Sequence, residues 1–190
     1  MLNVIISGGP GCGKGTQSDL ISERFKLAHL STGHLLRIEI ANFSDLGREA
    51  QGYIAAGNLV PDEMILKLLA KTIDELPVTH GVIFDGYPRN VSQAAALDKL
   101  MEERGKKIDL FLDLTVPDEV MVERMLNRAK TSNRSDDTPD TCRHRVQVYH
   151  EQTAPVKEYY VKKGICTTID ATGSIESIFK EITKVFELMM

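Results

Sequence analysis

The sequence of 190 residues has only three cysteines, no tryptophan and no long apolar run. Cys12, Cys142 and Cys166 are too few and too scattered for a disulfide framework, and no C-x-x-C pair suggests a zinc site. No apolar stretch approaches the roughly 20 residues of a membrane span. The apolar start at residues 1–6 has no basic segment before it, which indicates a strand rather than a signal peptide. We therefore expect a cytoplasmic protein without zinc or a membrane partner.

The chain also lacks the excess of positive charge that general nucleic-acid binders carry, since its formal net charge is -4. Its hydrophobic content of 42% is too high for a disordered protein. A chain of this length can bury roughly 70% of the surface that it exposes when unfolded. We expect one globular domain over residues 1–190 with no nucleic-acid partner, and a monomer as the default.

Short apolar runs alternate along the chain with segments of helical periodicity. The strand candidates are residues 3–7, 28–30, 82–84, 110–115 and 166–169. Segments such as 174–188 repeat apolar residues every three or four positions, which is typical of one helix face. This alternation predicts an α/β fold of three layers, α/β/α, around a five-stranded parallel sheet. Ligands in such folds bind at the carboxyl ends of the strands.

Two segments interrupt the alternation. Between residues 32 and 69, helical stretches at 35–40, 45–56 and 61–69 follow one another without a strand, which predicts a small helical excursion from the sheet. Residues 130–140 carry no apolar side chain beyond proline and the threonine methyl groups, which predicts a solvated loop.

A glycine-rich segment, Gly8 to Thr16, directly follows the first predicted strand and precedes a helix. Its glycines let consecutive N–H groups point at a phosphate, the helix adds its positive dipole end, and Lys14 brings a full charge. An ordinary glycine-rich turn would explain neither Lys14 nor the flanking strand and helix. The hydroxyl of Thr16 comes one place later than in the general Walker pattern, which leaves direct Mg²⁺ ligation by this P-loop open.

A second anion site is expected beside the first. Thr32 opens a helix that carries Arg37 near its start, where N–H groups also face outward. Asp85 ends an apolar strand in the Walker B position, where a carboxylate holds Mg²⁺ directly or through water. Arg89, stiffened by Pro88, has the planar fork that suits a phosphate.

Five of the ten arginines lie between positions 124 and 145: Arg124, Arg128, Arg134, Arg143 and Arg145. Arg124 and Arg128 are four apart and share one helix face, where like charges repel. Such a cluster in an acidic protein favours a polyanion between the arginines.

The chain resembles the short-lid adenylate kinases, of the nucleoside monophosphate kinase family, over essentially its whole length. The shared motifs, in order, are GGPGCGKGTQ, STGHLLR, GNLVPDE, FDGYPRNVSQ, RMLNRAKTSNRSDD and RHRVQVYHEQTAPV. The resemblance implies Mg²⁺-dependent, reversible transfer of the γ-phosphoryl group of ATP to AMP, giving two ADP. It divides the domain into a core (1–30, 61–128, 140–190), a monophosphate-binding lobe (about 31–60) and a lid (about 129–139).

The resemblance also implies a role for individual residues by position. Catalysis would rest on Lys14, Arg89, Arg124, Arg134 and Arg145. ATP would be held by Gly11, Cys12, Gly13, Lys14, Gly15, Thr16, Arg128 and Gly173. AMP would be held by Thr32, Arg37, Asn58, Leu59, Val60, Gly86, Tyr87, Pro88, Arg89, Gln93, Arg134 and Arg145. Asp85 would hold Mg²⁺, through water.

Four positions depart from the family pattern: His34 stands where Asp is usual, Cys12 where a small residue or Ser is usual, Asn90 for Thr, and Asn133 for Gly. We expect His34 to weaken or retune AMP binding.

The Pro-Arg-Asn sequence ending at Asn90 resembles the UMP/CMP kinases, but Thr32 and the amide of Gln93, which can match a purine edge, favour AMP. Two other classes remain as alternatives: a P-loop switch that hydrolyses one nucleotide, and a nucleotide-binding protein with weak turnover.

Overall fold

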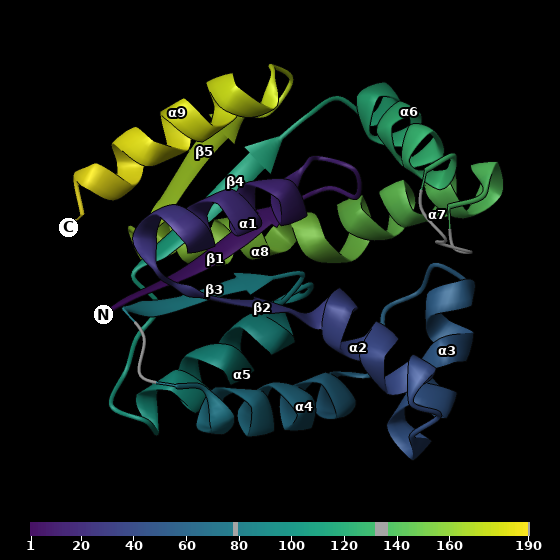
Figure 1. The fold of residues 1–190 in the computed structure, drawn as a ribbon, viewed down its shortest axis with the longest axis horizontal. Helices are drawn as coiled ribbons and strands as arrows, with labels where there is room; N and C mark the ends of the chain where they lie inside the picture. Colours follow the sequence, from purple (N-terminus) through teal and green to yellow (C-terminus); the bar gives the residue numbers. More distant parts are fainter. Residues whose placement is uncertain (78–79, 132–136, 190) are drawn as a thin grey trace.

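The computed structural model describes residues 1–77, 80–131 and 137–189 and contains one five-stranded sheet (Figure 1). The strands are β1 (Leu2–Gly8), β2 (Ala28–Ser31), β3 (Gly81–Asp85), β4 (Leu110–Thr115) and β5 (Cys166–Asp170). All neighbouring pairs are parallel, in the order β2-β3-β1-β4-β5. The predicted five-stranded parallel sheet is therefore confirmed, with most strands slightly longer than their apolar runs.

The central strands are buried on both faces, which explains their continuous apolar sequences. In β1, Val4 and Ile6 belong to the core on one face of the sheet, and Ile5 belongs to the core on the other. In β4, Leu112 and Phe111 divide in the same way. Side chains of a strand alternate between faces, so a run without polar residues needs a helical layer on each side.

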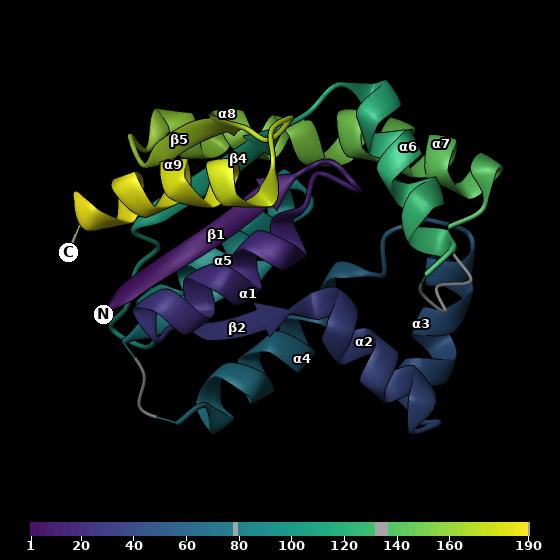
Figure 2. The ribbon, with the colours of Figure 1, turned by 45° about the horizontal axis from the view of Figure 1, so that its top comes forward.

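Among the described residues, two helices cover most of one face of the sheet and three cover most of the other (Figures 1 and 2). The first layer is α1 (Lys14–Phe25) and α9 (Ile175–Glu187); the second is α4 (Asp62–Glu75), α5 (Val91–Glu102) and α8 (Ala154–Lys162). The rings of Phe25 and Phe186 stack at 4.8 Å between α1 and α9. The rings of Phe111 and Tyr160 stack at the same distance between β4 and α8. The predicted three-layer architecture is confirmed.

The helical excursion predicted after residue 32 is present. It consists of α2 (Thr32–Ala41) and α3 (Asp45–Ala55), which lead into α4 before the chain returns to the sheet at β3. The side chains of Ser31 and Ser44 cap the N-termini of α2 and α3. Helix α4 runs beyond the predicted end at residue 69, because Ile73 extends the buried row of Ile65 and Leu69.

The polar segment 130–140 differs from its prediction. Residues 132–136 lie outside the described part of the chain, but Asp137 is described and its side chain is fully buried. A loop that is solvated throughout was therefore the wrong expectation, and the reason is the pair of arginines that Asp137 contacts, described below. Helices α6 (Asp118–Ala129) and α7 (Pro139–Val148) flank the segment, and a π-helical turn, η1 (Tyr149–Thr153), joins α7 to α8.

No helix in the described ranges is both long and apolar enough to cross a bilayer.

Candidate active site

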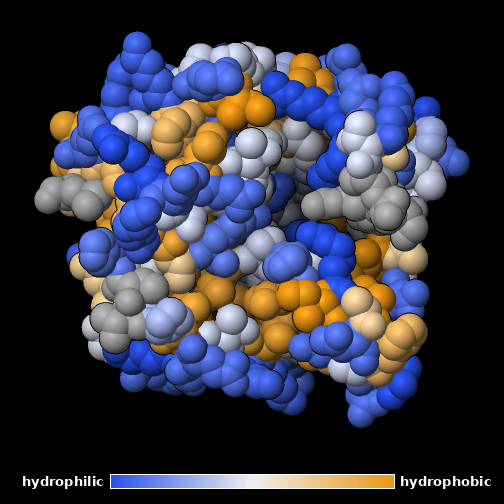
Figure 3. All heavy atoms as spheres, viewed as in Figure 1, coloured by the Kyte–Doolittle hydropathy of each residue, from blue (hydrophilic) through white to orange (hydrophobic). Residues whose placement is uncertain are grey.

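A cleft opens at the carboxyl ends of the strands, where the P-loop, α2, the 57–60 segment, α6 and α7 converge. The space-filling view shows the surface hollowed here, with a largely hydrophilic rim (Figure 3). Most residues expected to bind nucleotide line it together. They are Gly11, Lys14, Gly15, Thr32, Arg37, Asn58, Leu59, Val60, Asp85, Gly86, Tyr87, Arg89, Gln93, Arg128 and Arg145.

Other predicted residues lie elsewhere. Arg134 is outside the described residues, as is Asn133. Cys12 is 1% exposed and packs in the core, so that only its backbone could reach a phosphate. Pro88 lines a smaller hollow next to the cleft. Residues outside the lining of both hollows are Gly13, Thr16, Arg124 and Gly173.

The P-loop has the backbone form that a phosphate cradle requires. Gly11 has φ 81° and Gly13 has φ 94°, left-handed values that favour glycine, and Gly13 precedes the first turn of α1. The Lys14 ammonium donates to the Gly9 carbonyl at 3.3 Å, so it folds back over the loop. The amides and the lysine therefore converge on the space that an anion would occupy.

Asp85, at the end of β3, lies beside the P-loop. A Cβ placed on Gly15 would be 3.7 Å from its Oδ2. Burial alone would raise the pKa of Asp85, but the hydrogen bond from His29 and the charges of Lys14, His29 and Arg89 outweigh burial and lower it. Asp85 is therefore a carboxylate at neutral pH although it is only 7% exposed.

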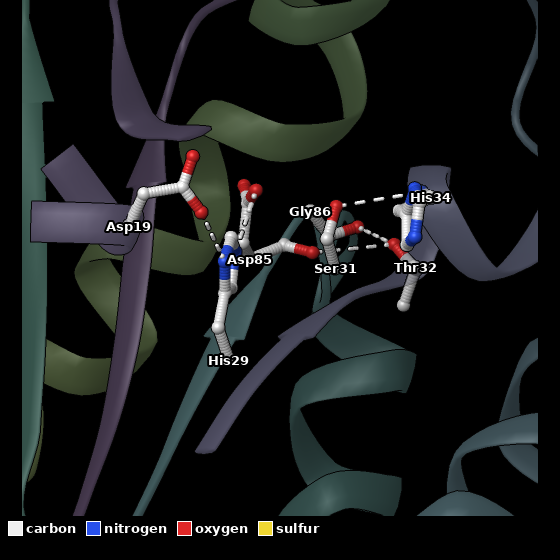
Figure 4. A network of polar contacts seen from close by, with 7 residues as sticks. All are labelled: Asp19, His29, Ser31, Thr32, His34, Asp85 and Gly86. Atoms are coloured by element: carbon white, nitrogen blue, oxygen red, sulfur yellow. Dashed lines mark hydrogen bonds and ion pairs between the residues drawn. The ribbon is translucent and has the colours of Figure 1, made fainter. Parts of the chain in front are cut away.

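His29 links two carboxylates, as Figure 4 shows. Its Nε2 lies 3.3 Å from Asp85 Oδ2, and its Nδ1 lies 2.9 Å from Asp19 Oδ1. Burial opposes the charged form of His29, but the hydrogen bonds and charges of Asp85 and Asp19 outweigh it and raise the pKa. Only an imidazolium can donate to both carboxylates at once, because a neutral ring has one N–H.

On the β2–β3 side of the cleft, hydrogen bonds hold Thr32, which follows β2, and Arg89, which comes four residues after the end of β3. The Thr32 hydroxyl donates to the Gly86 carbonyl at 2.9 Å (Figure 4). The Arg89 Nε donates to the same carbonyl at 2.7 Å, and Thr153 from η1 donates to the Arg89 carbonyl at 2.8 Å. Arg89 is thereby held by both its side chain and its backbone at the edge of the cleft. Arg37 lies against Gly33 on the first turn of α2, where a Cβ on Gly33 would be 3.2 Å from its Nη1.

The α6–α7 side of the cleft carries two arginines that share one buried carboxylate. Arg128 donates to Asp137 through Nε at 2.7 Å and through Nη2 at 2.8 Å, and Arg145 donates to it at 2.9 Å. The Asp137 side chain is fully buried, so it depends on these charged partners. The arginine cluster is thus compensated in part by the protein itself, which the sequence argument for a polyanion did not foresee.

Arg124 and Gly173 do not line the cleft. Arg124 donates to the carbonyls of Ala171 at 2.9 Å, Cys12 at 3.4 Å and Thr172 at 3.4 Å. It therefore ties the P-loop to Ala171 and Thr172. Its predicted catalytic role stays a prediction.

Three residues at or beside the cleft were missed from the sequence: His29, Asp62 and Asp137. His29 is two residues before Ser31 in β2, and no local motif marks it. Asp62 could not be found from local sequence, because its partners Asn90 and Gln93 are 28 and 31 positions away along the chain. Asp137 had a usable signal, since an aspartate between five arginines is a natural partner for one of them. His34, singled out for its departure from the family pattern, is exposed and lies outside the cleft lining.

Within the described ranges, no three His, Cys, Asp or Glu side chains are grouped as a metal-binding cluster. A metal in this cleft would therefore need a ligand set completed by something other than protein carboxylates, such as water or phosphate oxygens.

Comparison with known proteins identifies the family of this chain. A family model described as adenylate kinase matches residues 6–165. The chain is 46% identical over 189 residues to an adenylate kinase of Bacteroides fragilis, covering 100% of both chains. It is 48% identical over 182 residues to one of Parabacteroides distasonis, covering 96% of each, and 43% identical over 177 residues to one of Stenotrophomonas maltophilia, covering 93% of this chain and 95% of the relative. The chain belongs to the adenylate kinase family and has adenylate kinase activity.

Proposed function

We propose that the cleft holds two nucleotides with their phosphates facing each other, ATP over the P-loop and AMP over the β2–β3 side. The reaction is the reversible transfer of the γ-phosphoryl group of ATP to AMP, which gives two ADP. The supporting observation is that Lys14, Arg89 and Arg145 come from three different parts of the chain and line one cleft. A protein that binds a single nucleotide needs the first of these sites only.

Mg²⁺ fits the residues present. Asp85 is a buried, ionised carboxylate beside the P-loop, and hard oxygen donors of this kind suit the ion. Since Asp85 Oδ2 already accepts from His29, contact through a water molecule suits the site better than full ligation by the side chain. Bound with ATP, Mg²⁺ would neutralise part of the phosphate charge.

The chain's own residues would act by position and charge. Phosphoryl transfer through a loose transition state needs little covalent chemistry, so no side-chain nucleophile is required. Lys14 and the P-loop amides would hold the donor phosphates, and Arg89 would orient the acceptor phosphate. Arg128 and Arg145 would bring positive charge from the α6–α7 side, and Arg134 and Arg124 would add to it. Closing the cleft would exclude water that could otherwise attack ATP.

The domain division expected from the resemblance remains part of the proposal. The monophosphate-binding lobe is placed at about 31–60, with Thr32, Arg37 and the 58–60 backbone facing AMP, and the lid at about 129–139. Among the described residues, α2 and α3 make up most of the lobe and contact each other more than they contact the sheet, which suits a unit able to move against the core.

An assay that couples ADP formation to a visible signal tests the proposal. Mg²⁺ and ATP are supplied with AMP, UMP, CMP or dTMP in turn. Rapid ADP formation with AMP, and slow formation with the pyrimidine nucleotides, is expected. AMP-independent hydrolysis would contradict the proposal and favour a P-loop switch. Lys14→Gln should abolish turnover, whereas the control Lys184→Gln, which changes an exposed lysine paired with Glu181, should not.

A further inference from the structure

Gln93 stands at the cleft with both ends of its amide engaged by the protein. It is 2% exposed and lines the cleft. Its Oε1 accepts from the Arg89 backbone N–H at 2.7 Å, and its Nε2 donates to Asp62 Oδ1 at 2.7 Å. The amide nitrogen keeps a second N–H and the amide oxygen keeps a second lone pair, and both can bind a ligand.

These two partners fix which way the amide points. A backbone N–H can only donate and a carboxylate can only accept, so rotating the amide by 180° would oppose donor to donor and acceptor to acceptor. Burial alone would raise the pKa of Asp62, but the hydrogen bonds from Ser92, Asn90 and Gln93 outweigh burial and lower it. Asp62 is therefore an acceptor throughout the neutral range.

Asp62 is itself anchored from two helices. It lies in the first turn of α4, where a negative charge meets the positive end of the helix dipole. Asn90 donates to its Oδ1 at 3.0 Å, and the Ser92 hydroxyl donates to its Oδ2. Asn90 in turn caps α5 by accepting from the Gln93 N–H at 2.8 Å. The asparagine that departs from the family pattern thus completes the network around Gln93.

We propose that Asp62 is a positioning residue that locks the Gln93 amide so that it presents a donor beside an acceptor to the base of the monophosphate. The inference rests on the proposed function and adds the means of base selection. Adenine offers the complementary pair, an acceptor at N1 and a donor at the 6-amino group. Hypoxanthine differs from adenine only by a 6-oxo group, which reverses the pair to a donor at N1 and an acceptor at O6.

The experiment compares AMP with IMP as phosphate acceptor in the intact protein. The readout is the ratio of kcat/KM for AMP to kcat/KM for IMP, with KM for ATP recorded beside it. Asp62→Asn keeps the side-chain shape, but its amide can donate as well as accept, so it no longer dictates the orientation of Gln93 and leaves only the Arg89 N–H to do so. We expect the ratio to fall about tenfold, as for loss of one hydrogen bond to a charged group, with KM for ATP within twofold of the parent.

Asp74→Asn is the matched control. It makes the same change at the other end of α4, where Asp74 forms an exposed ion pair with Arg104. Its AMP to IMP ratio should equal that of the parent. A ratio in Asp62→Asn that also stays within twofold of the parent would overturn the inference, and so would an equal fall in both variants.

A double variant keeps the test decisive if Asp62→Asn folds poorly. In Asp62→Asn with Gln93→Glu, the new asparagine can donate to the new carboxylate, and the Arg89 N–H still can, so the network closes again. The base then meets acceptors only, and preference should move towards IMP relative to the parent. An unchanged preference for AMP would refute the inference. If the parent protein forms no ADP with AMP at all, the proposed function fails, and the inference fails with it.

Discussion

His144 Nε2 donates to Asn58 Oδ1 at 2.8 Å, a hydrogen bond between α7 and the turn that follows α3. The two residues are 86 positions apart, and Asn58 lines the cleft. The approach around them is close, since a Cβ on Gly57 would lie 3.0 Å from a methyl carbon of Thr141 and 3.1 Å from the Arg145 side chain. The α7 side and the turn after α3 are therefore in direct contact.

His144→Ala should favour an open cleft. Losing one hydrogen bond of about 1 kcal/mol shifts the balance between closed and open forms roughly fivefold. We expect KM for AMP to rise by up to about fivefold while kcat stays the same or increases. His150→Ala is the control, because His150 bonds Asp118 on α6 and does not cross the cleft. Equal effects of the two substitutions on KM would contradict this reading.

Asp137→Asn should destabilise the protein through Arg128 and Arg145. Among the described residues, Asp137 is the only carboxylate that these two arginines share. The substitution removes its negative charge, so the repulsion between the two guanidinium groups is no longer offset by it. We expect the free energy of unfolding, from urea titration, to fall by about 2 kcal/mol, and by less with ATP bound, since phosphate can replace the carboxylate. Asp140→Asn, which removes an exposed pair with Arg143, should change it little. A loss that ATP does not reduce would speak against phosphate binding by these arginines.

Arg89→Ala should lower kcat at least ~100-fold, comparable with the loss of one preorganised donor. Arg89 is held at the cleft by Gly86 and Thr153, so its charge is fixed before substrate binds. Arg48→Ala removes an exposed arginine on α3 and should leave kcat within about twofold. Near-normal turnover in Arg89→Ala, measured at saturating ATP and AMP, would refute its assignment.

Stability should depend on the charge of His29. Because its pKa is raised in the folded protein, its contribution is complete below the unfolded pKa of 6.5 and is lost as the pH rises through the folded value. The difference in unfolding free energy between the parent and His29→Gln should therefore be larger at pH 6 than at pH 9, by on the order of 1 kcal/mol for one hydrogen bond lost. Urea titrations at the two pH values measure it. A difference that grows with pH would show that the neutral ring is the form that stabilises.

The sequence predicts this fold and much of this site because its signals there are local. Apolar runs predict the strands, and the P-loop is predicted by three residues close together in sequence, Gly11, Gly13 and Lys14. No local sequence signal predicts the order of the strands in the sheet. That order places β3 next to β1, and so places Asp85 beside the loop that follows β1.

The parts that were missed depend on residues far apart in the sequence. Burial of Asp137 follows from two arginines on neighbouring helices, and the orientation of Gln93 follows from Asp62, 31 positions away. Polar side chains of this kind look like solvated loop residues until the fold supplies their partners.

The π-helical turn at Tyr149–Thr153 gives the chain a tolerance to length between α7 and α8. A π turn fits one residue more than an α turn into the same full turn, so deleting one of its residues would restore regular α winding with little rotation of α7 relative to α8. Helix α8 is fixed to the sheet by Val156 and Tyr160, and Arg145 would keep its place beside Asp137. A deletion in the regular part of α7, between Arg145 and the π turn, would instead rotate Arg145 by about 100° away from Asp137. Relatives should therefore differ in length by one residue at the π turn more readily than within α7.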